Sequence, residues 1–161
     1  LARLAARGIE QLRVTLHVGP GTFAPLTSED LTQHVMHAER YHISDEAAAQ
    51  IGAAKAAGRK VIAVGTTAVR TLETATPEGA EAPRAGSGES ALFIYPPYRF
   101  RVVDGLVTNF HLPKSTLLML VAALAGRRRV LAAYQEAVAR GYRFYSYGDA
   151  MFIPCAMRDL P

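Results

Sequence analysis

The segment from Val107 to Leu120, VTNFHLPKSTLLML, constrains the fold more than any other part of the chain. Its first four residues predict the end of a strand, which Pro113 stops. Ser115 occupies an N-cap position before an apolar run of helix formers, Thr116 to Ala125, and Gly126 closes that run. The segment therefore predicts a strand, a short turn and a capped helix in direct succession.

Several polar side chains gather where this helix is expected to begin. The first turn of a helix has unpaired N–H groups and the positive end of the helix dipole, which attract anionic or oxygen-rich ligands. A helix in a protein core needs only its cap, whereas this segment adds an amide, an imidazole, an ammonium group and a second hydroxyl. The surplus indicates a functional site formed by Asn109, His111, Lys114, Ser115 and Thr116.

Length and composition limit the classes of protein to which the chain can belong. The chain has 161 residues, half of them hydrophobic, which is enough for one domain with a real core. It opens with LARLAARG, which resembles the end of a helix, so we expect residues 1–161 to be the C-terminal part of a larger α/β domain. The single cysteine, Cys155, excludes an internal disulfide framework and a cysteine metal cluster. The longest apolar run, Leu117 to Ala125, is too short to span a bilayer.

The chain is basic, with a formal net charge of +4 and its densest cation cluster at Arg127, Arg128 and Arg129. Three arginines at a helix end are commonly no more than a solvated surface. A phosphate-contacting surface for RNA is the alternative, and charge alone does not decide between them.

Strand and helix signals alternate along the chain. Strands are predicted at residues 12–18, 36–43, 60–64, 91–95, 98–103, 106–110, 142–147 and 151–153, and helices at 45–57, 68–75, 116–125 and 128–140. Residues 78–90, rich in Gly, Pro and Ala, predict a surface loop, and Asp104-Gly105 predicts a hairpin turn. Alternation of this kind indicates an α/β fold in which helices flank a mixed sheet.

Histidines and a carboxylate mark a second region of possible chemistry. His17 lies at a predicted strand end, and Gly19 and Gly21 after it would let backbone approach a ligand, although a tight turn also needs such glycines. His37 and Glu39 share a face if their segment is a strand. Without a further ligand or an H-E-x-x-H spacing, acid–base or hydrogen-bonding work is favoured over a metal site.

Two further turns carry polar groups. Gly65-Thr66-Thr67 joins a predicted strand to a helix and suits a carboxylate or ribose, but it lacks a complete dinucleotide or Walker motif. The segment from Tyr142 to Asp149 packs four aromatic residues into eight positions and ends in an acid after Gly148. Such aromatics are usually part of a core, whereas Asp149 stands where a functional residue is expected.

Six segments together resemble the S-adenosylmethionine:tRNA ribosyltransferase-isomerase family of queuosine biosynthesis. They are LHVGPGTFAPL, HVMHAERYHIS, GRKVIAVGTTAVRTLE, LFIYPPYRF, GLVTNFHLPKSTLLMLVAALAG and YRFYSYGDAMFI, and they follow one another over nearly the whole chain. One departure is Pro96-Pro97-Tyr98, where the family pattern leads us to expect Pro-Gly-Tyr. The resemblance implies a longer protein with an N-terminal part and a small inserted β-domain before residue 1.

The resemblance also implies a reaction. Such an enzyme moves and isomerises the ribosyl group of S-adenosylmethionine onto 7-aminomethyl-7-deazaguanine in tRNA, giving epoxyqueuosine tRNA with release of adenine and methionine. S-adenosylmethionine is then a substrate, and no cofactor or metal is implied. We expect a cytoplasmic, monomeric protein with no membrane contact.

The chemistry needs a base beside the sulfonium and an acid for adenine, tasks that suit histidine. The resemblance makes four residues catalytic candidates: His17, His37, His111 and Glu39. Candidates for substrate binding are Gly19, Thr22, Gly65, Thr66, Thr67, Asn109, Ser115, Thr116, Tyr147 and Asp149, with Tyr145 as a further stacking residue. Arg127, Arg128 and Arg129 are the RNA-binding candidates.

Two other classes stay open at this stage. A non-catalytic RNA-binding module would use the basic helix and the aromatic strand. An S-adenosylmethionine-dependent methyltransferase is disfavoured, because no glycine-rich loop follows a first strand with a paired acidic residue.

Overall fold

The computed structural model describes residues 1–19, 34 and 36–155. Its helices are α1 (Ala2–Ala5), α2 (Asp45–Ala56), α3 (Thr66–Ala75), α4 (Thr116–Ala125) and α5 (Arg127–Ala139). Its strands are β1 (Thr15–Leu16), β2 (Glu39–Ile43), β3 (Ile62–Val64), β4 (Gly86–Ser90), β5 (Gly105–Asn109) and β6 (Ala150–Ile153). The α/β class is confirmed.

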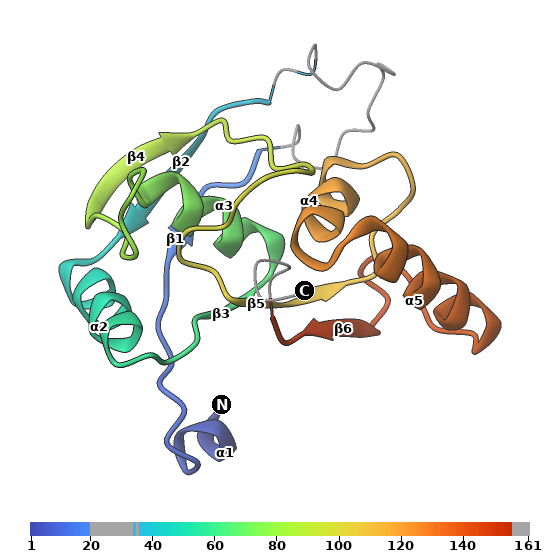
Figure 1. Ribbon diagram of the computed structural model, residues 1–161, viewed down its shortest axis with the longest axis horizontal. Helices are drawn as coiled ribbons and strands as arrows, with labels where there is room; N and C mark the ends of the chain where they lie inside the picture. The colour runs from blue at the N-terminus through green and yellow to red at the C-terminus, as the bar shows by residue number, and fades with distance from the viewer. Residues whose placement is uncertain (20–33, 35, 156–161) are drawn as a thin grey trace.

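The strands form two small sheets (Figure 1). The first has the order β1-β2-β4 and is antiparallel throughout. The second has the order β3-β5-β6, in which β3 and β5 are parallel and β6 is antiparallel to β5. A mixed sheet is therefore present, but its antiparallel strand is β6 rather than the expected hairpin partner.

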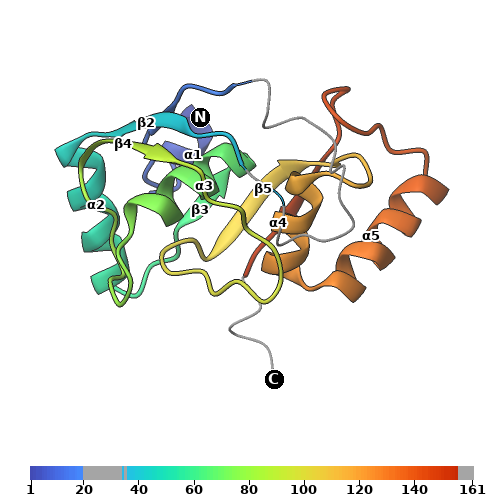
Figure 2. The ribbon, with the colours of Figure 1, turned by 90° about the horizontal axis from the view of Figure 1, so that it is seen from above.

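Helix α3 lies between the two sheets and contacts strands of both (Figures 1 and 2). Helices α2 and α5 stand at opposite ends of the molecule, and α4 lies against α5 (Figure 2). The core includes Ile43, Leu72, Val102, Leu106 and Leu120, so apolar side chains from both sheets and from α3 and α4 share one interior. None of the helices in the described part of the chain has the length and apolar character to cross a membrane.

The helices begin close to where the local sequence signals predicted. The Ser44 hydroxyl accepts a hydrogen bond from the Ala47 N–H at 3.1 Å, and the Ser115 hydroxyl accepts one from Leu118 at 3.2 Å. Both caps satisfy an amide that the helix itself leaves unpaired. The predicted helices 45–57, 68–75, 116–125 and 128–140 match α2, α3, α4 and α5 to within two residues at each end.

The predicted loop 78–90 is wrong in its last part, because Gly86 to Ser90 is strand β4. This sequence, GSGES, has no apolar alternation, and it becomes a strand by pairing along its whole length with β2. Ser90 is fully buried where β4 faces α3. A partner more than forty residues away in sequence therefore supplies what the local pattern lacks.

The expected strands 91–95 and 98–103 and the hairpin at Asp104-Gly105 are also wrong. The fully buried carboxylate of Glu73 accepts N–H bonds from Arg101, Val102 and Val103 at 2.9–3.2 Å. These are amides that a hairpin would have used in its ladder, so a side chain of α3 replaces the missing strand.

The segment 142–147, expected to be a strand, is a turn. Tyr145 has a left-handed backbone conformation with a φ of +64°, and Gly148 has a φ of +118°. The predicted strands 12–18 and 36–43 shorten to β1 and β2.

Candidate functional site

Three of the polar segments singled out in the sequence meet at one edge of the second sheet. Because β3 and β5 run parallel, Gly65 after β3 and Asn109 at the end of β5 lie at the same edge. The Gly65 N–H donates to the Val107 carbonyl at 2.8 Å. Strand β6 begins at this edge, where Ala150 pairs with Asn109. We call the residues 65–67, 109–116 and 142–149 the edge site.

Two helices begin at the edge site. Gly65, with a φ of +90°, turns the chain into α3, and the next residue, Thr66, is buried. Thr116, the first residue of α4, is 4% exposed, and its hydroxyl has no hydrogen-bond partner among the described residues. The two helix N-termini give the edge site several backbone donors suited to a carboxylate or a ribose.

His111 lies in this edge site as a buried, neutral group. A 2.8 Å hydrogen bond joins its Nε2 to the Thr108 hydroxyl, and its backbone N–H donates to the Tyr134 hydroxyl at 2.7 Å. Burial lowers the pKa of His111 from 6.5 to about 4. The imidazole is therefore uncharged at neutral pH.

Asp149 is held by a neighbour in its own turn. Its carboxylate accepts hydrogen bonds from the Arg143 backbone N–H at 2.6 Å and from the Arg143 Nε at 3.1 Å. These hydrogen bonds keep the pKa of the Asp149 carboxyl below its usual value. Tyr147 is 73% exposed in the same turn.

The remaining catalytic candidates lie on the first sheet and form a second cluster. Glu39, 3% exposed, makes a 2.7 Å ion pair with Arg70 of α3 and accepts the Gly19 N–H at 2.7 Å. The Arg70 guanidinium also donates to the Ser90 and Leu92 carbonyls. Glu39 thus ties the ends of β1 and β2 to the helix that begins at the edge site.

The other histidines are more open. His17, which follows β1, is exposed and borders a shallow hollow on the first sheet together with Arg40 and His42. His37 is exposed, and His34 stacks edge-on against Phe93 at a ring-centroid distance of 5.0 Å. No three His, Cys, Asp or Glu side chains gather as possible metal ligands within residues 1–19, 34 and 36–155. Thr22 lies outside the described residues.

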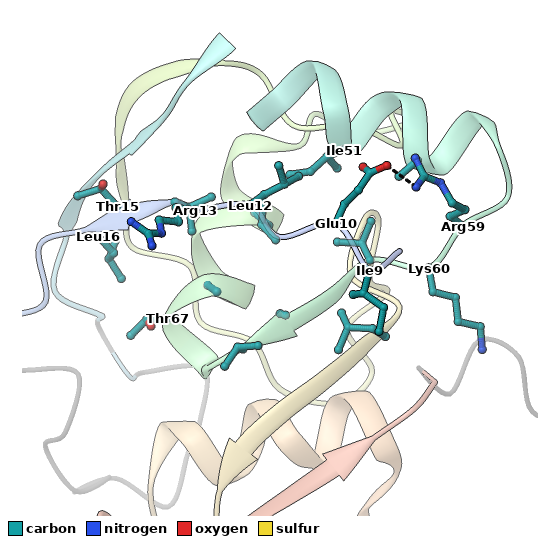
Figure 3. A pocket seen from close by; sticks show the side chains of 18 of the residues that line it. Ile9, Glu10, Leu12, Arg13, Thr15, Leu16, Ile51, Arg59, Lys60 and Thr67 are labelled. Atoms are coloured by element: carbon teal, nitrogen blue, oxygen red, sulfur yellow. Dashed lines mark hydrogen bonds and ion pairs between the residues drawn. The ribbon is translucent and has the colours of Figure 1, made fainter. Parts of the chain in front are cut away.

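A cavity of about 730 Å³ adjoins Thr67, between α3, β3 and the segment that leads into β1 (Figure 3). Leu16 lies at the Thr67 end, whereas Glu10 and Arg59, joined by a 2.7 Å ion pair, lie at the other. Its lining is mainly apolar with a few polar groups, and its volume lies in the range of small-molecule sites. The end of β1 and the first turn of α3 therefore line the same cavity.

The arginine cluster lies away from the edge site. Arg127, Arg128 and Arg129 are exposed in the first turn of α5, directly after the C-terminal end of α4. Since α4 begins at the edge site and α5 runs back along it, the cluster is separated from the site by the length of α4, about 15 Å.

Sequence reasoning missed three residues that shape these clusters: Arg70, Thr108 and Tyr134. No local pattern signalled the burial of Arg70, because its neighbours at i±3 and i±4 on α3 are all polar: Thr66, Thr67, Glu73 and Thr74. Tyr134 also had no local signal, because its contact with the His111 backbone joins residues 23 positions apart.

Comparison with known proteins gives one consistent family. The family model described as queuosine biosynthesis protein matches residues 1–153. Relatives from Anaeromyxobacter dehalogenans (strain 2CP-C) and Symbiobacterium thermophilum, both named S-adenosylmethionine:tRNA ribosyltransferase-isomerase, are each 62% identical over 153 residues. These matches cover 95% of this chain and 44% and 45% of the relatives.

A solved structure agrees with this. The crystal structure of S-adenosylmethionine tRNA ribosyltransferase from Thermotoga maritima has a TM-score of 0.75 and 45% sequence identity, over 94% of this chain and 47% of that one. The chain thus spans less than half the length of the proteins it matches. With a family model matching 153 residues and the same fold in a solved relative, the chain belongs to the queuosine biosynthesis protein family.

Proposed function

We propose that this chain forms part of an enzyme that transfers and isomerises the ribosyl group of S-adenosylmethionine onto 7-aminomethyl-7-deazaguanine in tRNA. The product is epoxyqueuosine tRNA, and adenine and methionine leave. Membership of the family and the names of the relatives support this activity. The single observation that carries it is the convergence of two helix N-termini and a buried histidine at one sheet edge.

The donor binds where β3 and β5 end. Thr66 and Thr67 at the start of α3, with Ser115 and Thr116 at the start of α4, supply backbone and hydroxyl groups for its carboxylate and ribose hydroxyls. The Thr116 hydroxyl, which has no hydrogen-bond partner in the described part of the chain, supports this, because a buried hydroxyl without a hydrogen bond costs free energy until a ligand meets it. S-adenosylmethionine acts as a substrate, and the chemistry uses no metal or cofactor.

Proton transfer is divided between the two clusters. A base must remove the proton beside the sulfonium, and an acid must assist the departure of adenine. The buried, neutral His111, held through Nε2 by the Thr108 hydroxyl, is one candidate for this proton transfer. The exposed His17 and His37 are the other candidates, and Glu39 accepts the backbone N–H of Gly19, two residues after His17.

The RNA substrate reaches both the edge site and α5. Three positive charges in the first turn of α5 oppose the helix dipole, so helix stability alone does not account for them. A phosphate backbone gives them a favourable partner. Asn109 and Tyr147, exposed at the edge site, are placed to meet the modified base or its neighbours. The protein is monomeric and cytoplasmic in this proposal.

Product analysis tests the reaction. In a hybrid enzyme, residues 1–153 replace the matching segment of the Anaeromyxobacter dehalogenans relative, and the hybrid is given S-adenosylmethionine and tRNA bearing the aminomethyl base. Release of adenine and methionine with ribosylated tRNA is expected. S-adenosylhomocysteine instead would identify a methyltransferase. RNA binding without any turnover, in a hybrid that folds, would favour a non-catalytic RNA-binding module.

A further inference from the structure

The turn from Tyr142 to Asp149 has a packed base and an exposed tip. The ring of Phe144 packs against Phe110 and Tyr134 at centroid distances of 5.3 and 5.5 Å. The Tyr145 N–H donates to the Phe110 carbonyl at 2.7 Å. These contacts fix the turn against the end of β5, so its exposed side chains are held in place rather than on a free loop.

Two tyrosines occupy the tip. Tyr145 is 39% exposed and Tyr147 is 73% exposed, whereas the neighbouring Phe144 is half-buried. Contacts that anchor the turn therefore use the rings of Tyr142 and Phe144, and they leave the rings of Tyr145 and Tyr147 open to solvent. A fold that needed the turn only as a connection would not require these two rings.

The backbone at this end of β5 is strained. Among the described residues, Lys114 and Tyr145 are the two non-glycine residues with a positive φ, at +55° and +64°. Lys114 follows β5 by five residues, and the Tyr145 N–H donates to the carbonyl of Phe110, directly after β5, so both residues with positive φ lie in the edge site. Left-handed backbone is costly for side chains larger than glycine, and such positions concentrate at ligand contacts.

The charges around the tip favour an anion. Arg143 pairs with Asp149, and Arg140 pairs with Glu136 at the end of α5, so the nearby carboxylates are each neutralised by an arginine. Lys114 is exposed and has no ion pair with any residue of the described segments. Lys114 is thus a cation available to an incoming phosphate.

We propose that Lys114, Tyr145 and Tyr147 form the surface that grips unpaired nucleotides of the RNA beside the edge site. The tyrosine rings stack on bases, and the Lys114 ammonium pairs with a backbone phosphate. The proposal rests on the proposed function only in taking RNA as the substrate. In this proposal the RNA has two separate contacts with the protein. The turn 142–149 follows the C-terminal end of α5, whereas the arginine cluster lies at the N-terminal end of α5, about 20 Å away, and contacts phosphates alone.

Binding of two RNA probes tests this surface. The probes are a fluorescent RNA hairpin with an unpaired loop and an uninterrupted duplex of the same stem, titrated with the 161-residue chain. Tyr147→Ala and Tyr145→Gly should each weaken hairpin binding by roughly 5- to 150-fold and leave duplex binding unchanged. Tyr145→Phe keeps the ring and should bind like the unmodified chain. Lys114→Ala should lower the slope of log affinity against log salt by about one.

Matched controls and stability separate binding from folding. Phe152→Ala removes an exposed aromatic ring from β6, and Lys60→Ala removes an exposed cation before β3; both should bind the hairpin normally. Tyr145→Gly relieves the positive φ, so its melting temperature should not fall while its affinity does.

Equal losses for hairpin and duplex, a loss in Phe152→Ala as large as in Tyr147→Ala, or no measurable hairpin binding would overturn the proposal. A hybrid that binds the hairpin through these tyrosines but turns over no S-adenosylmethionine would instead refute the proposed reaction and leave the surface in place.

Discussion

The hydroxyl of Thr108 lies 2.8 Å from Nε2 of His111, and both side chains are buried where β5 ends. The spacing of three residues lets the chain turn back so that the last part of the strand supplies the imidazole's partner. The Tyr134 hydroxyl also accepts a hydrogen bond from the backbone N–H of His111, so both the backbone and the imidazole of His111 are held in place. His111 is thus fixed in the edge site before any ligand arrives.

Acid should destabilise the protein through His111. Its pKa is about 4 in the folded chain and 6.5 when exposed, so the unfolded chain takes up a proton first as pH falls. The stabilisation is complete above pH 6.5 and is lost progressively towards pH 4, by up to about 3 kcal/mol. Melting temperatures measured across this range should fall less steeply in His111→Asn than in the unmodified chain. His42→Asn, which alters an exposed histidine, should keep the original pH dependence.

His111 should also affect turnover. In the hybrid enzyme, a role in proton transfer predicts that His111→Ala and His111→Asn lose about 10²–10⁴ in kcat with little change in melting temperature. A purely structural role predicts a destabilisation of about 1–3 kcal/mol with kcat nearly intact at a permissive temperature. Parallel kinetics and thermal melts of the two variants distinguish these patterns, and the second would move the proton-transfer role to His17 or His37.

The ion pair between Glu39 and Arg70 should be a major element of stability. Both side chains are at most 3% exposed, so Arg70→Met leaves a buried carboxylate without its cation and should cost about 3–5 kcal/mol in urea unfolding. The double variant Glu39→Gln/Arg70→Met should recover much of this loss, since neither charge remains buried. Arg59→Ala breaks the exposed pair with Glu10 and should change the free energy of unfolding by less than about 1 kcal/mol. An equal loss of stability on breaking either ion pair would contradict the prediction that the buried Glu39–Arg70 pair matters more.

The arginine cluster should account for a measurable share of the salt dependence of tRNA binding. Replacing Arg127, Arg128 and Arg129 by alanine should lower the slope of log affinity against log salt by roughly two to three, because each phosphate contact releases about one counterion. A control triple variant, with the exposed Arg3, Arg7 and Arg84 changed to alanine, should keep the original slope. If the two triple variants behave alike, the cluster is only a solvated helix end.

Local sequence determined the parts of this protein whose hydrogen bonds close within a few residues. The caps at Ser44 and Ser115, the helices that follow them and the strand before His111 were predicted because their signals and their partners lie side by side in sequence. The family and the α/β class followed from motifs spread along the whole chain, and both are confirmed.

Only the tertiary structure decided which segments meet. Strand β4 exists because β2 pairs with it, and the expected hairpin is absent because the Glu73 carboxylate takes the amides of residues 101–103. The edge site likewise depends on the parallel pairing of β3 with β5, which brings Gly65 to the end of β5. The physical reason is that a buried amide or charge needs a hydrogen-bond or ion-pair partner. A sequence pattern indicates that a partner is needed but not which distant residue will be that partner.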